Sequence, residues 1–403
     1  MIRAQALAAL LPALLPALLL SGSPARAQIP LPWLSGYYLT VPLWSDAGPF
    51  SEGGFGNSQR LRLMADQRLG PVAFDAAYEH FISWSATAGG GLGLDVPGAV
   101  APGGGEWLDL QWVIEEDENL RWTHRFDRLS VTAAAGDLLS VTAGRQTISW
   151  ATTLFLTPAD PFVPFDPADP FREYRAGVDA GRVRLFPGPL SEAEIVVRPA
   201  KFRFDETLSV LGRYKGVVSS WELSGYVGVL HDRPALSFGG AGGIGQAALR
   251  GEIQLRDEPD EFSFRGTAGV DTRFDALGRD LYVIFEYQHD DFGASSADEL
   301  EEVVLSLPFA RGELQVLSAD VTVWQGSWQL HPLFSTQLLV LWSLNDLSAL
   351  FAPGASYSLS EDATAQGGVF VGVGNGNVTP GDLLPSEYGV VPTTIYASIS
   401  LFI

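Results

Sequence analysis

The sequence predicts an all-β fold: a closed antiparallel transmembrane β-barrel of about 18 strands, with one loop folded inward. Three observations lead to this prediction. Apolar and polar residues alternate with a period of two in one run after another. Gly, Trp, Tyr and Phe are plentiful, which suits strands, tight turns and interfacial aromatic rings. Cysteine is absent, so we expect a large closed sheet to stabilise the chain in place of disulfides.

The chain opens with a predicted signal peptide, residues 1–27. Arg3 supplies the positive start, residues 6–20 form an apolar run, and Ala25-Arg26-Ala27 is a small-x-small cleavage motif. The apolar run is shorter than the roughly 20 residues that a helical membrane span needs, and two prolines interrupt it. We therefore expect an exported protein that is cleaved near Ala27.

Two further segments follow the signal peptide. Residues 28–58 are rich in Pro, Gly and aromatics and show no long period, so a leader, a plug and a poorly formed first strand all remain open. Residues 59–403 are predicted to form the transmembrane barrel, because alternating runs separated by turn residues recur from there to the end.

The clearest of these runs is the hairpin Gln246–Asp271. One face carries Arg250, Glu252 and Arg256, and the other carries small and apolar residues. Such a hairpin packs a core in a soluble sandwich, whereas in a barrel its apolar face meets lipid and its charged face lines a wet interior. The expected strands, in chain order, are Arg60–Ala65, Pro71–Ile82, Trp107–Ile114, Arg128–Ala135, Leu138–Trp150, Val178–Phe186, Leu190–Arg198, Thr207–Tyr214, Val218–Leu230, Ala235–Gly242, Gln246–Arg256, Phe262–Asp271, Leu281–Tyr287, Glu313–Trp324, Phe334–Leu344, Ser348–Leu359, Thr364–Gly374 and Pro392–Ile403.

Two connections stand out among the turns. Ser296–Glu302 is predicted to be a short helix capped by Ser296. Counting strands back from the C-terminus places the long Ser85–Gly105 loop at the periplasmic end, although long loops of such barrels are external. We therefore expect the number of wall strands between Gly70 and Gly136 to differ by one from this list.

The last strand is amphipathic to its end. Ile395, Ala397, Ile399, Leu401 and Ile403 form its apolar face. An exposed edge of this kind would invite aggregation in a soluble protein, and pairing with the first strand removes the edge. The stretch resembles the C-terminal signal of Gram-negative outer-membrane proteins, although Ile403 stands where Phe is usual. The resemblance implies outer-membrane lipid and the barrel-assembly machinery as partners.

A second resemblance rests on residues 144–170. Gly144-Arg145-Gln146 is followed by Trp150, Pro158-Ala-Asp-Pro161 and Pro164-Phe-Asp-Pro-Ala-Asp-Pro170. This segment resembles a pattern in Gram-negative porin-like outer-membrane β-barrels, including alginate-export-type and related uncharacterised barrels. Thr157 stands where that pattern has Asn. The resemblance implies a pore whose loop folds inward, and it identifies no cargo.

The loop Ala151–Gly177 has the chemistry of a stiff segment. Its prolines fix the backbone, its phenylalanines offer apolar anchors, and Asp160, Asp166 and Asp169 can cap turns. An inward constriction is the favoured interpretation, and an external loop without effect on flux is the alternative. Three aspartates also raise calcium binding, but their spacing fits no known calcium loop, so we predict no metal site.

The predicted pore wall mixes both signs of charge. Its candidate pore-lining residues outside the loop's aspartates are Arg172, Arg175, Arg182, Arg184, Glu192, Glu194, Arg198, Arg250, Glu252, Arg256 and Arg265. Rings of charge set ion preference in pores. The alternative is that Arg–Glu pairs neutralise one another and brace the wall, which is the better reading for any single pair.

Composition and motifs narrow the function. The net charge of −22 repels nucleic acid, so nucleic-acid binding is excluded. Five scattered histidines lack metal-ligand spacing, and catalytic motifs are absent, so we predict no cofactor and no enzyme. We expect a porin-like channel of the bacterial outer membrane for passive passage of small polar or charged solutes. The alternative is a plugged structural or adhesive barrel without flux; an outer-membrane hydrolase is the third. A homo-oligomer is left open.

Overall fold

The computed structural model describes residues 33–86, 105–162, 167–171, 174–259, 261–380 and 383–403. The signal peptide expected at residues 1–27 lies outside these ranges. The strands are β1 (Leu34–Ser45), β2 (Gly54–Leu69), β3 (Val72–Ser85), β4 (Gln111–Glu116), β5 (Leu120–Ala135), β6 (Leu139–Gln146), β7 (Val178–Gly188), β8 (Ser191–Lys201), β9 (Glu206–Val218), β10 (Trp221–Leu230), β11 (Arg233–Ile244), β12 (Ala247–Asp257), β13 (Phe262–Ala276), β14 (Arg279–Asp290), β15 (Asp320–His331), β16 (Phe334–Ser343), β17 (Ala349–Ser360), β18 (Ala363–Val373) and β19 (Thr394–Phe402); the helical turns are η2 (Ala297–Glu299), α2 (Leu300–Val304) and α3 (Leu307–Ala310).

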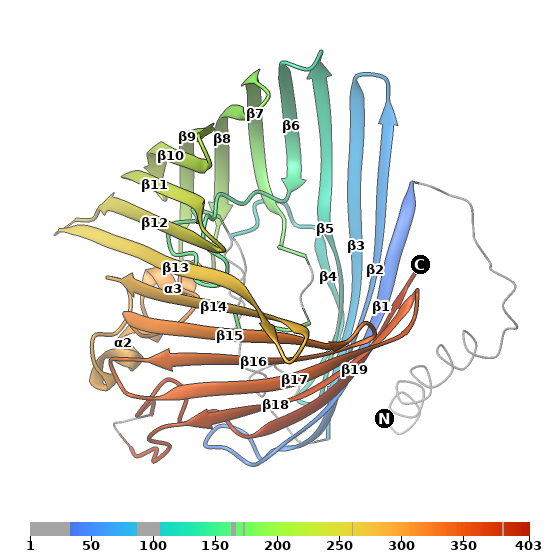
Figure 1. The fold of residues 1–403 in the computed structure, drawn as a ribbon, viewed down its shortest axis with the longest axis vertical. Helices are drawn as coiled ribbons and strands as arrows, with labels where there is room; N and C mark the ends of the chain where they lie inside the picture. Colours follow the sequence, from blue (N-terminus) through green and yellow to red (C-terminus); the bar gives the residue numbers. More distant parts are fainter. Residues whose placement is uncertain (1–32, 87–104, 163–166, 172–173, 260, 381–382) are drawn as a thin grey trace, which may run out of the picture.

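All strands except β4 form one closed antiparallel ring. Each pairs with its sequence neighbours, with β3 joined directly to β5, and the first and last strands pair through registers such as Tyr38↔Leu401. The ring therefore has 18 strands, as the sequence predicted. Figure 1 shows them wrapped around an interior into which the chain runs after β6. Closure leaves no unpaired edge between β1 and β19.

Burial in this ring is inverted relative to a soluble protein. On β12, Gln254 and Arg256 are each 1% exposed, whereas Ile253 and Leu255 are 42% and 36% exposed. The same alternation on β19 buries Thr394 and Ser398 and exposes Ile395 and Ile399. Charged and polar residues thus face inward and aliphatic residues face outward, which is the pattern of a barrel wall in lipid. The hairpin read from the sequence is the pair β12–β13, in register from Ala247↔Thr272 to Asp257↔Phe262.

The strand count was right although one expected wall strand was wrong. Trp107–Ile114 was expected in the wall, but β4 covers only Gln111–Glu116, pairs only with β5 and lies outside the ring. Its place in the ring is filled by β1, which lies within residues 28–58. Omitting β4 also moves the loop between β3 and β5 to the other end of the barrel, which removes the conflict over its side. Glu313–Ala319, expected in a strand, precede β15.

The two ends of the barrel differ in their connections. At one end, where β1 begins and β19 ends, the turns are tight, such as residues 70–71, 219–220 and 332–333. At the other end lie the longer connections 86–119, 147–177, 291–319 and 374–393. The helix expected at Ser296–Glu302 is present as η2 and α2, but the Ser296 side chain makes no cap hydrogen bond. Within the described ranges, no helix is long and apolar enough to cross a bilayer.

Candidate functional site

The described parts of the connection between β6 and β7, residues 147–162, 167–171 and 174–177, leave the wall and cross the barrel interior. We call this connection the inner loop. Its first arm meets two buried carboxylates of the opposite wall. Glu252 of β12 accepts hydrogen bonds from the backbone amides of Thr152, Thr153 and Ala159, at 2.6, 3.3 and 3.3 Å. Glu286 of β14 accepts from Leu154, Phe155 and Leu156, at 2.6, 2.9 and 2.9 Å.

The buried carboxylates and the inner-loop amides supply each other with the hydrogen bonds that water would otherwise provide. Glu252 and Glu286 are 4% and 1% exposed, so each needs hydrogen-bond donors to stay buried. The irregular loop backbone has amide groups that no strand partner satisfies, and a charged acceptor binds them strongly. The two glutamates therefore hold the first arm of the loop at one depth inside the barrel.

A second group of contacts surrounds the same arm. Gln315, from the connection before β15, accepts from the Thr157 amide at 2.5 Å and donates to the Phe155 carbonyl at 2.8 Å. Tyr226 of β10 donates to the Ala159 carbonyl, and Arg198 of β8 donates to the Pro161 carbonyl. Together with Glu252 and Glu286, these residues fix the loop backbone from four strands and one connection.

The second arm returns along the opposite side of the barrel. Arg60 of β2 donates to the Phe171 carbonyl at 3.1 Å. The Tyr174 ring stacks on Tyr37 of β1, and the Arg62 guanidinium lies 4.7 Å from its centroid. An ion pair of 2.8 Å between Arg175 and Asp160 ties the two arms together. The inner loop therefore reaches both sides of the interior.

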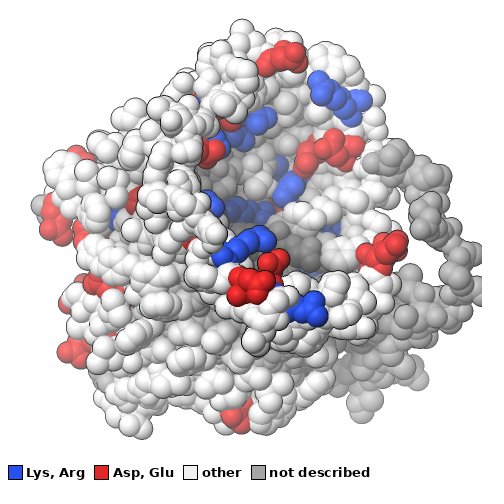
Figure 2. Space-filling view, in the orientation of Figure 1, with Lys and Arg blue, Asp and Glu red and all other residues white. Residues whose placement is uncertain are grey.

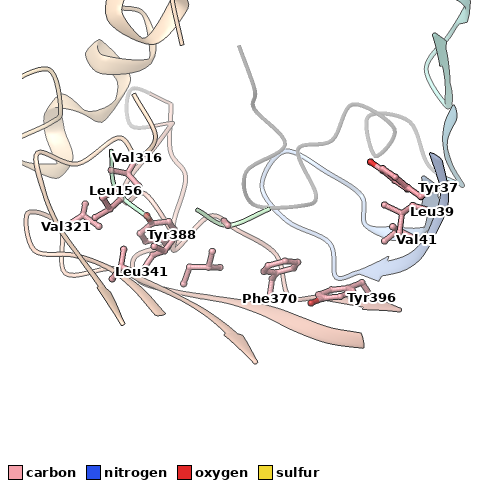
Figure 3. Packing of buried hydrophobic residues seen from close by; sticks show 13 residues of the cluster. Tyr37, Leu39, Val41, Leu156, Val316, Val321, Leu341, Phe370, Tyr388 and Tyr396 are labelled. Atoms are coloured by element: carbon pink, nitrogen blue, oxygen red, sulfur yellow. The ribbon is translucent and has the colours of Figure 1, made fainter. Parts of the chain in front are cut away.

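Apolar side chains of the inner loop pack on one sector of the wall. Leu156 and Ala168 belong to a buried cluster with residues from β1 and β15–β19. Figure 3 shows Leu156 beside Val316 and Val321, with Phe370 and Tyr396 farther along the same inner face. Phe171 adds an edge-to-face contact of 4.8 Å with Tyr396. This packing explains how apolar loop residues such as Phe155 and Phe171 can lie inside a polar barrel.

The remaining inner wall is crossed by ion pairs. Figure 2 shows the hollow of the molecule, with basic side chains inside it and acidic ones at several places around it. The pairs within 3 Å include Arg62–Glu79, Arg62–Asp127, Arg145–Asp179, Arg182–Glu194, Arg250–Asp271, Arg256–Glu313 and Arg265–Asp290. Most of these partners bridge neighbouring strands, so they brace the wall as well as charge it.

The candidate residues read from the sequence fall into separate groups. Asp160 and Arg175 pair within the inner loop, and Asp169 accepts from the Phe171 amide. Glu192 and Glu194 pair with Arg182, while Arg250, Arg256 and Arg265 pair with other acids. The Arg184 guanidinium lies 5.7 Å from the Phe186 ring. Arg172 and Asp166 lie outside the described residues.

Sequence reasoning missed several residues that hold the inner loop. Alternation in the strand predicted at Leu281–Tyr287 puts Glu286 on the polar face, so its inward direction was readable, but its loop partners were not. Gln315 and Glu313 were read as strand residues, and they lie in a connection that folds into the mouth. Arg60 and Arg62 were recognised only as the polar alternates of a strand.

Two titratable groups in the connections are strongly perturbed. Burial favours the neutral form of Glu313, yet Arg256 and other cations outweigh it and lower its pKa to about 2. Burial lowers the pKa of His231, in the β10–β11 turn, to about 3; the Glu313 carboxylate opposes this shift, and nearby arginines add to it. At neutral pH the first is therefore a carboxylate and the second an uncharged imidazole. Within the described residues, no cluster of His, Asp and Glu could hold a metal ion.

Comparison with known proteins relates this geometry to a fold. No protein-family model and no curated protein sequence matches the chain. Among solved structures, OccAB1 of Acinetobacter baumannii matches with a TM-score of 0.54 and 8% identity, over 92% of this chain and 96% of that one. A BenF-like porin from Pseudomonas fluorescens Pf-5 gives 0.53 and 11%, over 92% and 97%. The outer membrane protein opdK of Pseudomonas aeruginosa gives 0.52 and 9%, over 92% and 98%. At these identities the likeness shows a porin-like barrel fold.

Proposed function

We propose that this chain is a porin-like channel of the bacterial outer membrane, through which small polar or charged solutes pass passively. One observation carries the proposal: a stiff loop is fixed inside a closed barrel whose inner wall is charged and whose outer wall is aliphatic. A charged interior is favourable only where water or polar solutes reach it. The porin-like fold of the solved neighbours supports the same function.

The inner loop is the proposed constriction, and the charged wall is the proposed pore lining. The pore-lining candidates are those named from the sequence: Asp160, Asp166, Asp169, Arg172, Arg175, Arg182, Arg184, Glu192, Glu194, Arg198, Arg250, Glu252, Arg256 and Arg265. We add Glu286 and Arg60, because they hold the two arms of the loop. Tight turns are periplasmic in barrels of this kind, so the end with the long connections would face the outside of the cell.

Three proposals concern assembly. Residues 1–27 would direct export and be removed near Ala27. The strand β19 would be recognised by the barrel-assembly machinery, because it is amphipathic and exposes apolar alternates such as Ile395 and Ile399. Homo-oligomerisation stays a proposal that cross-linking of the protein in native membranes would test. The likeness to alginate-export-type barrels likewise stays a proposal, resting on residues 144–170.

Single-channel recording in a planar bilayer tests the channel. We expect steady conductance from the refolded barrel, and a reversal potential under a salt gradient that reports its ion preference. Deletion of Pro158–Pro170 should enlarge the current, because it removes the part of the inner loop that crosses the interior. A correctly folded, heat-modifiable barrel without conductance would replace this proposal by the plugged structural or adhesive barrel.

A further inference from the structure

One sector of the barrel wall carries no side chain that is charged at neutral pH. The strands β16, β17, β18, β19 and β1 are consecutive in the ring, and their sequences contain no Asp, Glu, Lys, Arg or His. The inner wall of β2–β14 carries the ion pairs described above. The interior is therefore divided into a charged side and an uncharged side.

A cavity of about 200 Å³ lies between the inner loop and this uncharged sector. Leu154, Phe155, Pro167, Ala168 and Pro170 line it from the loop side. Leu339, Ala352 and Phe370 line it from the wall, and Gln325, Gln337, Tyr396 and Asp169 add polar atoms. The lining combines an apolar body with a few polar groups, which is the composition of small-molecule sites.

The chemistry of the lining selects against anions. Among the described residues, no basic side chain lines the cavity, and the one charged group, Asp169, is acidic. The Asp169 carboxylate also accepts the Phe171 amide at 2.8 Å, so part of its capacity is already used. An anion placed here would lose water and gain no cationic partner.

One polar atom in the lining lacks a protein partner. The Oε1 atom of Gln325 is buried and accepts no hydrogen bond within the described residues. A buried acceptor without a donor is costly, and a ligand hydroxyl in the cavity would supply that donor. Gln337, on the adjacent strand β16, is a second amide that could contact the same ligand.

The size of the cavity fits one ring. A cavity of roughly 150 Å³ lined by aliphatic and aromatic side chains is large enough for benzene. Phe155 and Phe370 offer ring faces or edges from the two sides of this one. We infer that the cavity is a binding subsite for uncharged solutes built on one six-membered ring that bears hydroxyl donors. Its role in flux rests on the proposed channel function, whereas binding itself does not.

Calorimetry with the full barrel in detergent micelles tests the subsite directly. Resorcinol is the uncharged probe, and benzoate and benzylammonium are its charged counterparts; empty micelles are titrated as the blank. We expect resorcinol to bind at least ten-fold more tightly than benzoate. Equal or tighter binding of either charged probe, or no heat above the blank, would overturn the inference.

A matched pair of variants on β17 locates the binding. Ala352 lines the cavity, and Ser356 lies four residues further on the same inner face outside the lining. Ala352→Trp should weaken resorcinol binding at least ten-fold, whereas Ser356→Trp should leave it unchanged. Equal losses in both would show general narrowing and refute the subsite. Gln325→Leu should weaken resorcinol several-fold. The difference in gel migration between heated and unheated samples checks that each variant is folded.

The two proposals fail in distinguishable ways. If the barrel does not conduct but still binds resorcinol next to Ala352, the subsite is supported and the channel is refuted. If the barrel conducts but Ala352→Trp leaves resorcinol binding unchanged, the channel is supported and the subsite is refuted. In a conducting barrel, resorcinol should also reduce the single-channel current of the wild type, and it should not reduce that of Ala352→Trp.

Discussion

At the scale of single residues, two glutamates act as acceptors for a loop. Each replaces the strand partners that the backbone of residues 152–159 lacks, and each is hidden from water. Alternation predicts that Glu252 and Glu286 face inward, and Glu252 was a candidate on that ground. The identity of the amides that they bind depends on where a distant loop folds, which no local pattern records.

Glu286→Ala should both destabilise the barrel and loosen the constriction. The change leaves three loop amides without their acceptor, which costs on the order of 3 kcal/mol. We expect a lower urea midpoint in lipid vesicles and a larger, noisier single-channel current. Glu286→Gln retains one acceptor oxygen and should show a smaller effect.

The control for this prediction is Glu222→Ala on β10. Glu222 pairs with Lys215 at 2.8 Å, and its side chain is 47% exposed. Its loss should therefore change the urea midpoint little. If Glu286→Ala destabilised the barrel no more than Glu222→Ala, the anchoring of the inner loop would be refuted.

His231 should make folding sensitive to mild acid. Its pKa falls from an ordinary 6.5 to about 3 in the folded barrel, because burial disfavours the imidazolium. The unfolded chain binds this proton below pH 6.5 and the folded chain does not, so stability falls as pH decreases from 6.5 towards 3. The expected slope for one proton is about 1.4 kcal/mol per pH unit.

His231→Asn tests this linkage. Asn tolerates the backbone angle φ of 50° at this position and does not titrate. Urea midpoints at pH 6, 5.5 and 5 should fall less steeply for the variant than for the wild type. The pKa of Glu313 is lowered from 4.5 to about 2, so the stability that its carboxylate contributes is lost only below about pH 4.5. Glu313 therefore does not titrate between pH 5 and 6. Identical slopes would contradict the assignment to His231.

At the scale of elements, alternation identifies wall strands and cannot identify their neighbours. β4 has the apolar and polar residues of a wall strand, yet it pairs with residues 121–125 of β5, beyond the end of β6. β1 is broken by Pro and Gly and has weak alternation, yet it closes the ring. Pairing decides both cases, and pairing is a property of the whole sheet.

The inverted wall predicts opposite effects at adjacent residues of β17. Ala355 pairs with Thr336 and Gly367 on the outward face, and Ser356 pairs with Ser335 and Gln366 on the inward face. Ala355→Arg should destabilise the folded barrel by roughly 2–4 kcal/mol, because it places a cation against lipid near the middle of a strand. Ser356→Arg should cost little, because its side chain reaches the wet interior.

Folding into lipid vesicles at increasing urea measures this difference. The two variants differ by one position and carry the same side chain, so bulk and charge are matched. Equal free energies of unfolding would mean that the outward face of β17 does not contact lipid. A partner chain covering this face in an oligomer would give that result, which would then be visible as a shift in mass.

At the scale of the whole molecule, the sequence predicts the barrel wall better than it predicts the contacts of the loop inside the barrel. Alternation, turn residues and the amphipathic last strand predict a closed sheet, because each is a local consequence of having lipid on one side. The inward course of the loop predicted at Ala151–Gly177 was indicated by its Pro and Phe content. Its anchors at Glu286, Gln315 and Arg60 are more than 100 residues away in the chain, so they appear only in the folded structure.

The charge balance of the interior leads to a last prediction, on ion preference. Most inner-wall arginines pair with acids, but within the described residues neither Arg128 nor Arg184 forms a salt bridge with a carboxylate. In the described part of the chain their Nε atoms are buried without a hydrogen-bond partner. The Arg128 guanidinium lies 5.6 Å from the centroid of the Tyr174 ring, and that of Arg184 lies 5.7 Å from the centroid of the Phe186 ring. These two guanidiniums should therefore attract anions more than the paired arginines do.

The variant Arg128→Gln with Arg184→Gln should shift the reversal potential towards cation preference, with roughly a two-fold change in the permeability ratio. The direction holds whether the wild type prefers anions or cations, since two positive charges leave the interior and no carboxylate is removed with them. Arg68→Gln with Arg279→Gln removes the same charge near the tight turns at residues 70–71 and 277–278, where water and salt screen it. A shift of equal size in this control would assign selectivity to the net charge of the barrel, and the unpaired guanidiniums would then have no special part in it.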